Sequence, residues 1–175
     1  LIQGNTVIEG AVYAHKLEIT QGDVEIRGAV YTKLELHVDS SARGPITFRK
    51  AVASSDSIAS LNSNVRLYFL SDINAKSVKL TNAFVAGSIF ADEAILENCV
   101  VLGGSFATKR LHLKNCITGT FNAPQVAIQG DIRLLLPSAF SVEELRTIGE
   151  ARMFNLSLAD LGSLYTGNEQ LPESG

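Results

Sequence analysis

One short unit is repeated three times between residues 84 and 128, and this repeat constrains the fold more than any other feature of the sequence. The three copies begin at Gly87, Gly104 and Gly119, and the first two end in the same Leu-x-Asn-Cys pattern. A period of roughly 16 to 17 residues is too short for a helical hairpin repeat and is typical of one coil of a β-solenoid. The repeat therefore predicts short strands that stack coil upon coil.

The same unit extends towards the start of the chain in a less regular form. Earlier copies begin at Gly10, Gly28, Lys50 and Ser71, which brings the total to about seven coils. A solenoid needs about three repeats to bury a continuous core. We therefore expect an all-β fold, a single-stranded parallel β-helix of about seven coils, over residues 1–137.

Alignment of the copies places residues of one kind in columns. An inward apolar column is expected at Val12, Val30, Val52, Ile73, Ile89, Phe106 and Phe121. A column of small residues is expected at a bend, at Ala14, Thr32, Ser54, Ala75, Ala91, Thr108 and Ala123. Two more apolar columns are expected, one at Leu17, Leu34, Val78, Ala94, Leu111 and Val126, the other at Ile19, Leu36, Leu80, Leu96, Leu113 and Ile128. The alternation of apolar and polar residues is the period of a strand.

A turn residue recurs two positions after the inward leucines. Asn82, Asn98 and Asn115 hold this place in three coils, and Gly22 and Gly130 lie near it in two others. Asn and Gly are the residues that most readily adopt left-handed backbone geometry. We therefore expect a sharp corner of the coil at this column.

The repeat loosens between residues 38 and 65. Residues 40–45 combine serine, glycine and proline, and residues 54–64 are rich in serine, so both read as loops. Insertions in a solenoid map to loops on one face, which is often the binding face. A tolerated surface insertion without a role is the alternative, and we favour it.

The pattern changes after Pro137. Ser141 and Glu144 fit a capping box, and Val142, Leu145 and Ile148 recur at helical spacing. We therefore expect a helix here, packed on the apolar columns of the last coil.

A second short helix is expected over residues 157–165, where leucines again recur at helical spacing. Residues 138–167 would then form a C-terminal helical cap, and the polar residues 168–175 a disordered tail.

Composition excludes some partners. The net charge of −3 argues against nucleic acid, because proteins that bind it present a basic surface. No apolar run is long enough to span a membrane. The sequence opens at Leu1 without a methionine, so we expect that an upstream segment precedes it. A membrane anchor is possible only in that segment.

The two cysteines, Cys99 and Cys116, follow the turn asparagine in consecutive coils. Stacking should bring them close, but parallel side-chain vectors suit a disulfide poorly. We therefore expect two reduced, mostly buried thiols. Two cysteines are too few for a disulfide scaffold, which favours the cytoplasm.

No catalytic, cofactor-binding or metal-binding residues can be assigned from the sequence. The three histidines, His15, His37 and His112, lie at different positions of different coils and form no ligand cluster. Asp72 and Asp92 also differ in position, although glycoside chemistry requires a pair of carboxylates. No nucleophile triad, zinc spacing or phosphate loop is present in the sequence. We therefore expect a protein that is not an enzyme and needs no cofactor.

Asp92 shares a column with Lys76 and Lys109. Opposite charges on neighbouring coils indicate a solvent-exposed charge ladder along the solenoid axis.

The repeated Gly-Ala-Val-Tyr and Gly-Ser-Ile/Phe units, each followed by a Leu-x-Leu pair, resemble those of bactofilins, the bacterial polymer-forming cytoskeletal proteins. The resemblance covers about residues 6–132. It implies a right-handed β-helix whose subunits stack end to end into filaments without nucleotide. The irregular coils at 38–65 and the segment after Pro137 depart from that family, and the second departure puts free polymerisation at that end in doubt.

Two functions follow as hypotheses. The first is a non-enzymatic structural scaffold that self-associates through a coil end. The second is a carbohydrate-binding or carbohydrate-processing β-helix that uses a groove along one strand face. We expect the helical cap to close the C-terminal end, so that a homo-oligomer forms through the N-terminal coil end.

Overall fold

The computed structural model describes residues 1–136 and 140–155, and all the regular structure in these residues is β-strand. The strands, in chain order, are β1 (Ile2–Gln3), β2 (Thr6–Ile8), β3 (Val12–Gln21), β4 (Val24–Ile26), β5 (Val30–Val38), β6 (Ile46–Phe48), β7 (Val52–Ser54), β8 (Ser57–Ser60), β9 (Leu67–Phe69), β10 (Ile73–Thr81), β11 (Ala83–Val85), β12 (Ile89–Glu97), β13 (Val100–Lys114), β14 (Ile117–Leu134) and β15 (Ser141–Asn155).

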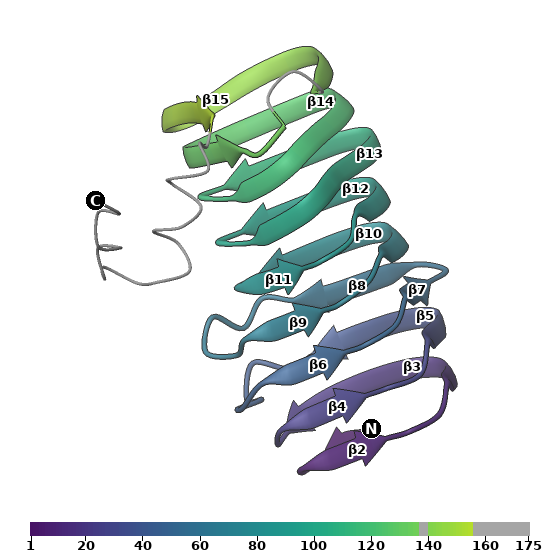
Figure 1. Ribbon diagram of the computed structural model, residues 1–175. Helices are drawn as coiled ribbons and strands as arrows, with labels where there is room; N and C mark the ends of the chain where they lie inside the picture. Colours follow the sequence, from purple (N-terminus) through teal and green to yellow (C-terminus); the bar gives the residue numbers. More distant parts are fainter. Residues whose placement is uncertain (137–139, 156–175) are drawn as a thin grey trace, which may run out of the picture.

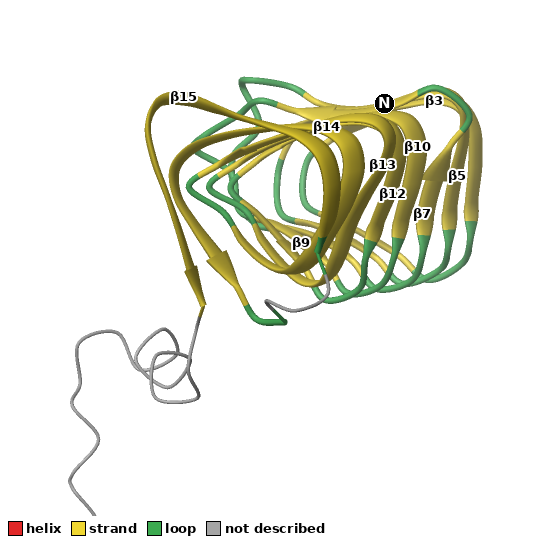
Figure 2. Cartoon of the chain, turned by 90° about the horizontal axis from the view of Figure 1, so that it is seen from above, coloured by secondary structure: helices red, strands yellow, loops and turns green. Residues whose placement is uncertain are grey.

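These strands wind into a parallel β-solenoid of about eight turns (Figure 1). Apart from the strands at the two ends, each pairs in parallel with the strands one coil before and after it, so that a single 15-stranded sheet wraps round the axis. Seen from above, the coils lie behind one another round a common core (Figure 2). The predicted β-helix architecture is therefore confirmed.

The sheet has three faces, named here by their short strands. Face 1 contains β7 and the segments of the longer strands that continue its ladder. Face 2 contains β1 and β8 and the segments in register with them. Face 3 contains β2, β4, β6, β9 and β11, followed by the first segments of β13 and β14.

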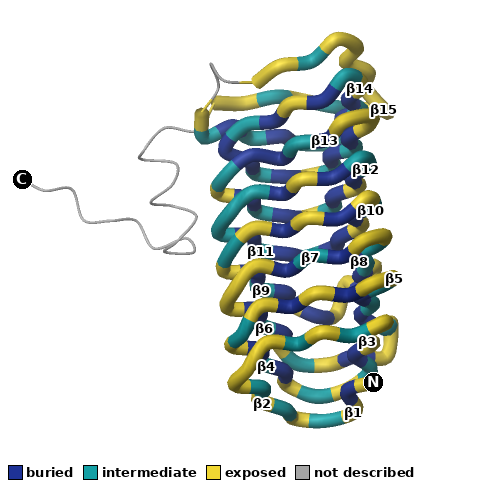
Figure 3. The backbone as a smooth tube through the Cα atoms, turned by 90° about the vertical axis from the view of Figure 1, so that its right-hand side faces the viewer, coloured by how far each residue is buried: buried dark blue, intermediate teal, exposed yellow. Residues whose placement is uncertain are grey.

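The core is formed by inward side chains of all three faces, which alternate with exposed ones along the chain (Figure 3). In-register pairing places like residues on top of one another. Phe48 and Phe69, for example, stack with ring centroids 4.8 Å apart and planes 10° from parallel. Burying an apolar side chain of this kind contributes about 1.5–3 kcal/mol, so the columns supply most of the stability.

The corner between face 2 and face 3 has the backbone geometry that the sequence predicts. Asn82, Asn98 and Asn115 have φ values of 55°, 52° and 50°, and Gly22 and Gly130 have 88° and 66°. Glycine adopts this left-handed region most readily, and asparagine tolerates it better than most other residues that carry a side chain. The expected corner is therefore confirmed.

One predicted column was displaced by a residue. Ile89 pairs with Ser105 and Ser105 with Phe121, so Ser105, not Phe106, is the inward residue of that coil. The glycine that repeats Gly87 is in fact Gly103, whose N–H donates to the Gly87 carbonyl at 3.0 Å.

The same displacement removes Thr108 from the small column, where Ala91 pairs with Ala107 instead. The buried Ser105 is tolerated because its hydroxyl hydrogen-bonds to the Thr118 hydroxyl at 3.1 Å.

A second displacement occurs near the start of face 2. Leu17 pairs with Leu36, and Ile19 pairs with Val38, whereas Leu34 lies outside the core and is 39% exposed. The turn from face 1 to face 2 is one residue longer in this coil, so the alternation restarts later than the repeat indicates. Both predicted columns were therefore wrong at this coil.

Residues 39–45 form a loop at the corner before face 3, as expected. The stretch 54–64, also expected to be a loop, is a loop only in part, because Ser57–Ser60 form β8, which pairs with β5 and β10. The side-chain amide of Asn62, which is buried, donates to the carbonyls of Asp39 and Ala42 at 2.9 and 3.0 Å. Asn62 therefore holds one loop against the next.

The predicted helix that begins at Ser141 is wrong. Residues 141–155 form β15, which pairs with β14 from Ser141 beside Asn122 to Asn155 beside Leu134. The edge of β14 offers a full row of backbone partners, and this pairing outweighs a local helical pattern. β15 adds a turn beyond the seven expected coils. The second predicted helix, at 157–165, and the tail, at 168–175, lie outside the described residues.

Asn98 tests the corner most directly, because its side chain makes no hydrogen bond within the described part of the chain. Asn98→Ala should lower the free energy of unfolding by about 1 kcal/mol, since alanine is strained at a positive φ. Asn98→Gly should leave the stability nearly unchanged. Urea denaturation of both variants measures the difference, and equal stability of the two would contradict the role assigned to the corner.

Candidate functional site

The histidines considered as ligands lie apart in the structure. His37 and His112 both point outward on face 2, but His37 is on β5, beside Glu18 and Ala59, and His112 is on β13, beside Ile95 and Ala127. Among residues 1–136 and 140–155, no three His, Cys, Asp or Glu side chains could hold one metal ion. No helix long and apolar enough to cross a membrane occurs in the same residues.

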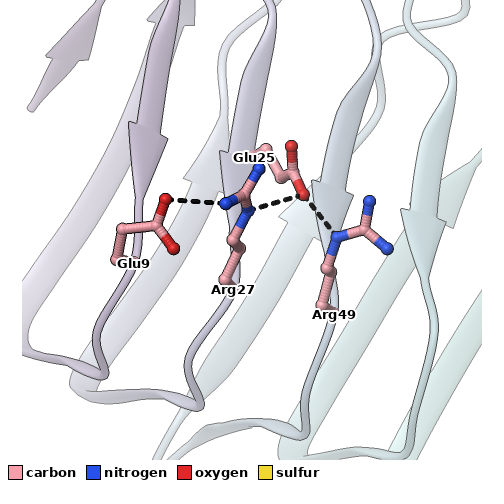
Figure 4. Close-up of polar contacts among 4 residues, drawn as sticks. All are labelled: Glu9, Glu25, Arg27 and Arg49. Carbon is pink, nitrogen blue, oxygen red and sulfur yellow. Dashed lines mark hydrogen bonds and ion pairs between the residues drawn. The ribbon is translucent and has the colours of Figure 1, made fainter.

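Charged side chains on the outer surface pair from coil to coil. The clearest network joins Glu9, Arg27, Glu25 and Arg49 (Figure 4). Arg27 donates to Glu9 at 2.7 Å and to Glu25 at 3.1 Å, and Arg49 donates to the same Glu25 oxygen. Hydrogen bonds from Arg49 and then Arg27 lower the pKa of Glu25 below its ordinary value.

This network was missed in the sequence, although a signal existed. Glu9, Arg27 and Arg49 each follow the last residue of a short face 3 strand, at the end of β2, β4 and β6. At this place in the repeat Glu9 carries the charge opposite to that of Arg27 and Arg49, and this contrast could have been recognised once the register of face 3 was known. A similar set links later coils, from Glu93 to Arg110 at 2.7 Å and from Asp131 to Arg152 at 3.1 Å.

The predicted ladder around Asp92 is present in part. Lys109 lies 3.5 Å from Asp92, and the Thr108 hydroxyl donates to the same carboxylate at 2.8 Å. Lys76 makes no ion pair within 4 Å in the described part of the chain, but its charge acts on Asp92. The hydrogen bond from Thr108, followed by the nearby Lys109 and Lys76, lowers the pKa of Asp92.

Cys99 and Cys116 lie in consecutive coils, as predicted, and both are buried. The thiol of Cys99 donates to the Leu80 carbonyl at 3.4 Å, and that of Cys116 to the Leu96 carbonyl at 3.2 Å. The neighbouring Cys116 thiol and burial raise the pKa of Cys99 well above its ordinary value. Cys99 is therefore an apolar core residue rather than a reactive thiol.

The two ends of the solenoid are the places where strands lack a partner on one side. At one end, β1, β2 and the part of β3 that precedes Ile19 are edges, and at the other end β15 is the edge. An unpaired edge is a template for a strand of another chain.

Gly28 and Gly10 show how closely coils approach near the first edge. A Cβ added at Gly28 would lie 2.3 Å from the backbone of Gly10, so the backbone of one coil passes directly over the next. Gly10 holds the same place one coil nearer the end, and a Cβ there would meet nothing within 4 Å. The position of Gly10 is therefore open to a second chain.

A hollow of about 650 Å³ lies on face 1, and the carbohydrate hypothesis expects a groove on one strand face without saying which. Tyr31 and Phe90 line it, together with Asn74 and Lys76. Asp92 is the only carboxylate among the described residues that line it.

Comparison of the chain with protein-family models, with curated proteins and with solved structures finds no match in any of the three.

The network around Glu25 should show in the pH dependence of stability. The pKa of Glu25 is lowered in the folded state, so its contribution is present above the unfolded value of about 4.3 and is lost as the pH falls through the folded value. Glu25→Gln should therefore lower the melting temperature at neutral pH, and the difference from wild type should vanish at acid pH.

Glu18→Gln is the matched control, because Glu18 makes no ion pair within the described residues. Its melting temperature should follow wild type at every pH. The effect at Glu25 should also shrink at high salt, because salt screens exposed ion pairs. A loss of stability for Glu25→Gln that is independent of both pH and salt would contradict the electrostatic account.

Proposed function

We propose that this protein is a non-enzymatic structural scaffold, a right-handed β-solenoid that self-associates through its N-terminal coil end. The observation that carries the proposal is the difference in charge between the two edges. The segments β1, β2 and Val12–Ala14 contain no charged residue, and the part of β3 between Ala14 and its first residue paired with β1, Ile19, adds Lys16 and Glu18. The edge strand β15 contains five, namely Glu143, Glu144, Arg146, Glu150 and Arg152.

Charged side chains on an edge strand discourage pairing with another chain, whereas an edge with few charges is more open to it. The N-terminal edge also leaves core residues incompletely covered, because Ile8 and Val12 are only partly buried against the core. A second copy would complete their burial and pair the free backbone groups of the edge.

A contact that uses the same end of both copies is two-fold and closes on itself. The predicted helical cap is absent at 141–148. In this proposal the charged edge of β15 prevents further subunits from adding at the C-terminal end instead. The resemblance to bactofilins supports end-to-end association, but the charged edge favours a dimer over a filament. Because two cysteines are too few for a disulfide scaffold, we also propose that the protein works in the cytoplasm.

The mass of the protein in solution, measured by sedimentation across a concentration series, tests this proposal. The mass should rise from one chain to two and then stop. Gly10→Lys should remain monomeric at every concentration, because its side chain projects from the end where the second copy would lie. Its melting temperature at low concentration should match wild type, since a Cβ at this position meets nothing within 4 Å.

Asn122→Lys is the matched control, because Asn122 is exposed on face 1, away from the N-terminal edge. This variant should dimerise like wild type. A wild-type protein that stays monomeric throughout the series would refute the proposal, and so would a Gly10→Lys variant that still dimerises. A mass that grows without limit would refute the two-fold contact.

A further inference from the structure

The outward column of face 1 is interrupted at one place. The residues in register along it are Tyr13, Tyr31, Ala53, Asn74, Phe90, Phe106 and Asn122. Two aromatic pairs are thus separated by two smaller side chains, Ala53 and Asn74. The hollow on face 1 is this gap, which spans three strand spacings, about 14 Å, from Tyr31 to Phe90.

The aromatic side chains at the two borders of the gap, Tyr31 and Phe90, are both available to a ligand. Phe90 stacks on Phe106 with ring centroids 5.3 Å apart, so one of its faces is covered. Its other face is turned towards the gap, in keeping with an exposed fraction of 42%. Tyr31, also 42% exposed, hydrogen-bonds through its hydroxyl to Ser55 of the next coil at 2.6 Å. This bond draws Tyr31 towards the gap and fixes its orientation.

Polar side chains lie between the two aromatic residues. Asn74 is exposed at the middle of the gap, and its amide makes no hydrogen bond to another described residue. Lys76, Asp92 and Thr108 line the same hollow, and the charges of Lys76 and Asp92 cancel. The backbone groups of face 1 are paired between coils, so a ligand can hydrogen-bond here only to side chains.

From this arrangement we propose that the gap binds a neutral, extended oligosaccharide lying along the solenoid axis between Tyr31 and Phe90. The C–H face of a pyranose ring packs on an aromatic face, and its hydroxyls pair with amide, ammonium and hydroxyl groups. A peptide would leave its own backbone groups unpaired here, because the strands of face 1 at the gap are already paired on both sides. The lining has no net charge, which matches a neutral sugar.

The site binds the sugar without cleaving it. Glycoside hydrolysis uses two carboxyl groups, one of them a general acid with a raised pKa. Asp92 is the single carboxylate among the described lining residues, and the hydrogen bond from Thr108 lowers its pKa. Asp92 therefore stays ionised and serves as a hydrogen-bond acceptor.

The test is titration of the 15N-labelled protein with cellohexaose and chitohexaose, followed by amide and side-chain NMR shifts. At least one of these sugars should bind saturably, and the shifts should concentrate at Tyr31, Asn74 and Phe90. Asn74→Phe should fill the gap by continuing the aromatic column and weaken binding by at least about tenfold. Asn122→Phe adds the same ring to the same column outside the gap, and should bind like wild type.

Several results would overturn the proposal. They are the absence of saturable binding by both sugars, shifts that map away from face 1, or unchanged affinity in a folded Asn74→Phe. Binding of an acidic oligogalacturonate in preference to both neutral sugars would overturn it as well. The shift map of the wild-type protein decides the question even if Asn74→Phe does not fold. The outcome is independent of self-association, which uses a different part of the molecule.

Discussion

In-register hydrogen bonding between successive coils is the interaction on which the rest of the structure depends. Each coil satisfies the backbone groups of its neighbours, so the register that pairs the backbones also decides which side chains stack. A residue that fits one coil must therefore suit the residue directly above it. The inward columns, the left-handed corner and the close passage of Gly28 over Gly10 all follow from this constraint.

In-register pairing also determines which parts of the surface are free to bind another molecule. Along the sides, opposite charges on neighbouring coils pair with one another, as Glu25 does with Arg27 and Arg49, and these positions are occupied by structural contacts. Unpaired backbone groups remain at the two end coils, and the N-terminal edge carries fewer charged residues than β15 does. On face 1 the aromatic column is broken by Ala53 and Asn74, which leaves a hollow. Self-association and ligand binding are proposed at these two interruptions of the pattern.

Where the reading of the sequence failed, a short local pattern competed with pairing between coils. Gly104 looks like the start of a unit, but Gly103 is the residue that pairs with Gly87. The predicted register was therefore off by one residue, and Phe106, which was expected to point inward, points outward. In residues 141–148 the helical spacing was real, yet the edge of β14 was available and a strand formed. The ion-pair network around Glu25 required the register of face 3, which the weaker early repeats do not define.

The sequence by itself determined the solenoid, the sharp corner at Asn82, Asn98 and Asn115, and the burial of Cys99 and Cys116. These features recur at a fixed period, and each coil has the same physical requirements. The repeat can therefore be recognised even where the alignment of one coil is wrong by a residue. Only the tertiary structure decided the features that occur once and are not repeated from coil to coil. These are the extra turn of β15, the difference in charge between the two edges, and the gap between Tyr31 and Phe90. Such features depend on which residues of distant coils lie side by side, and one added residue in a turn changes that.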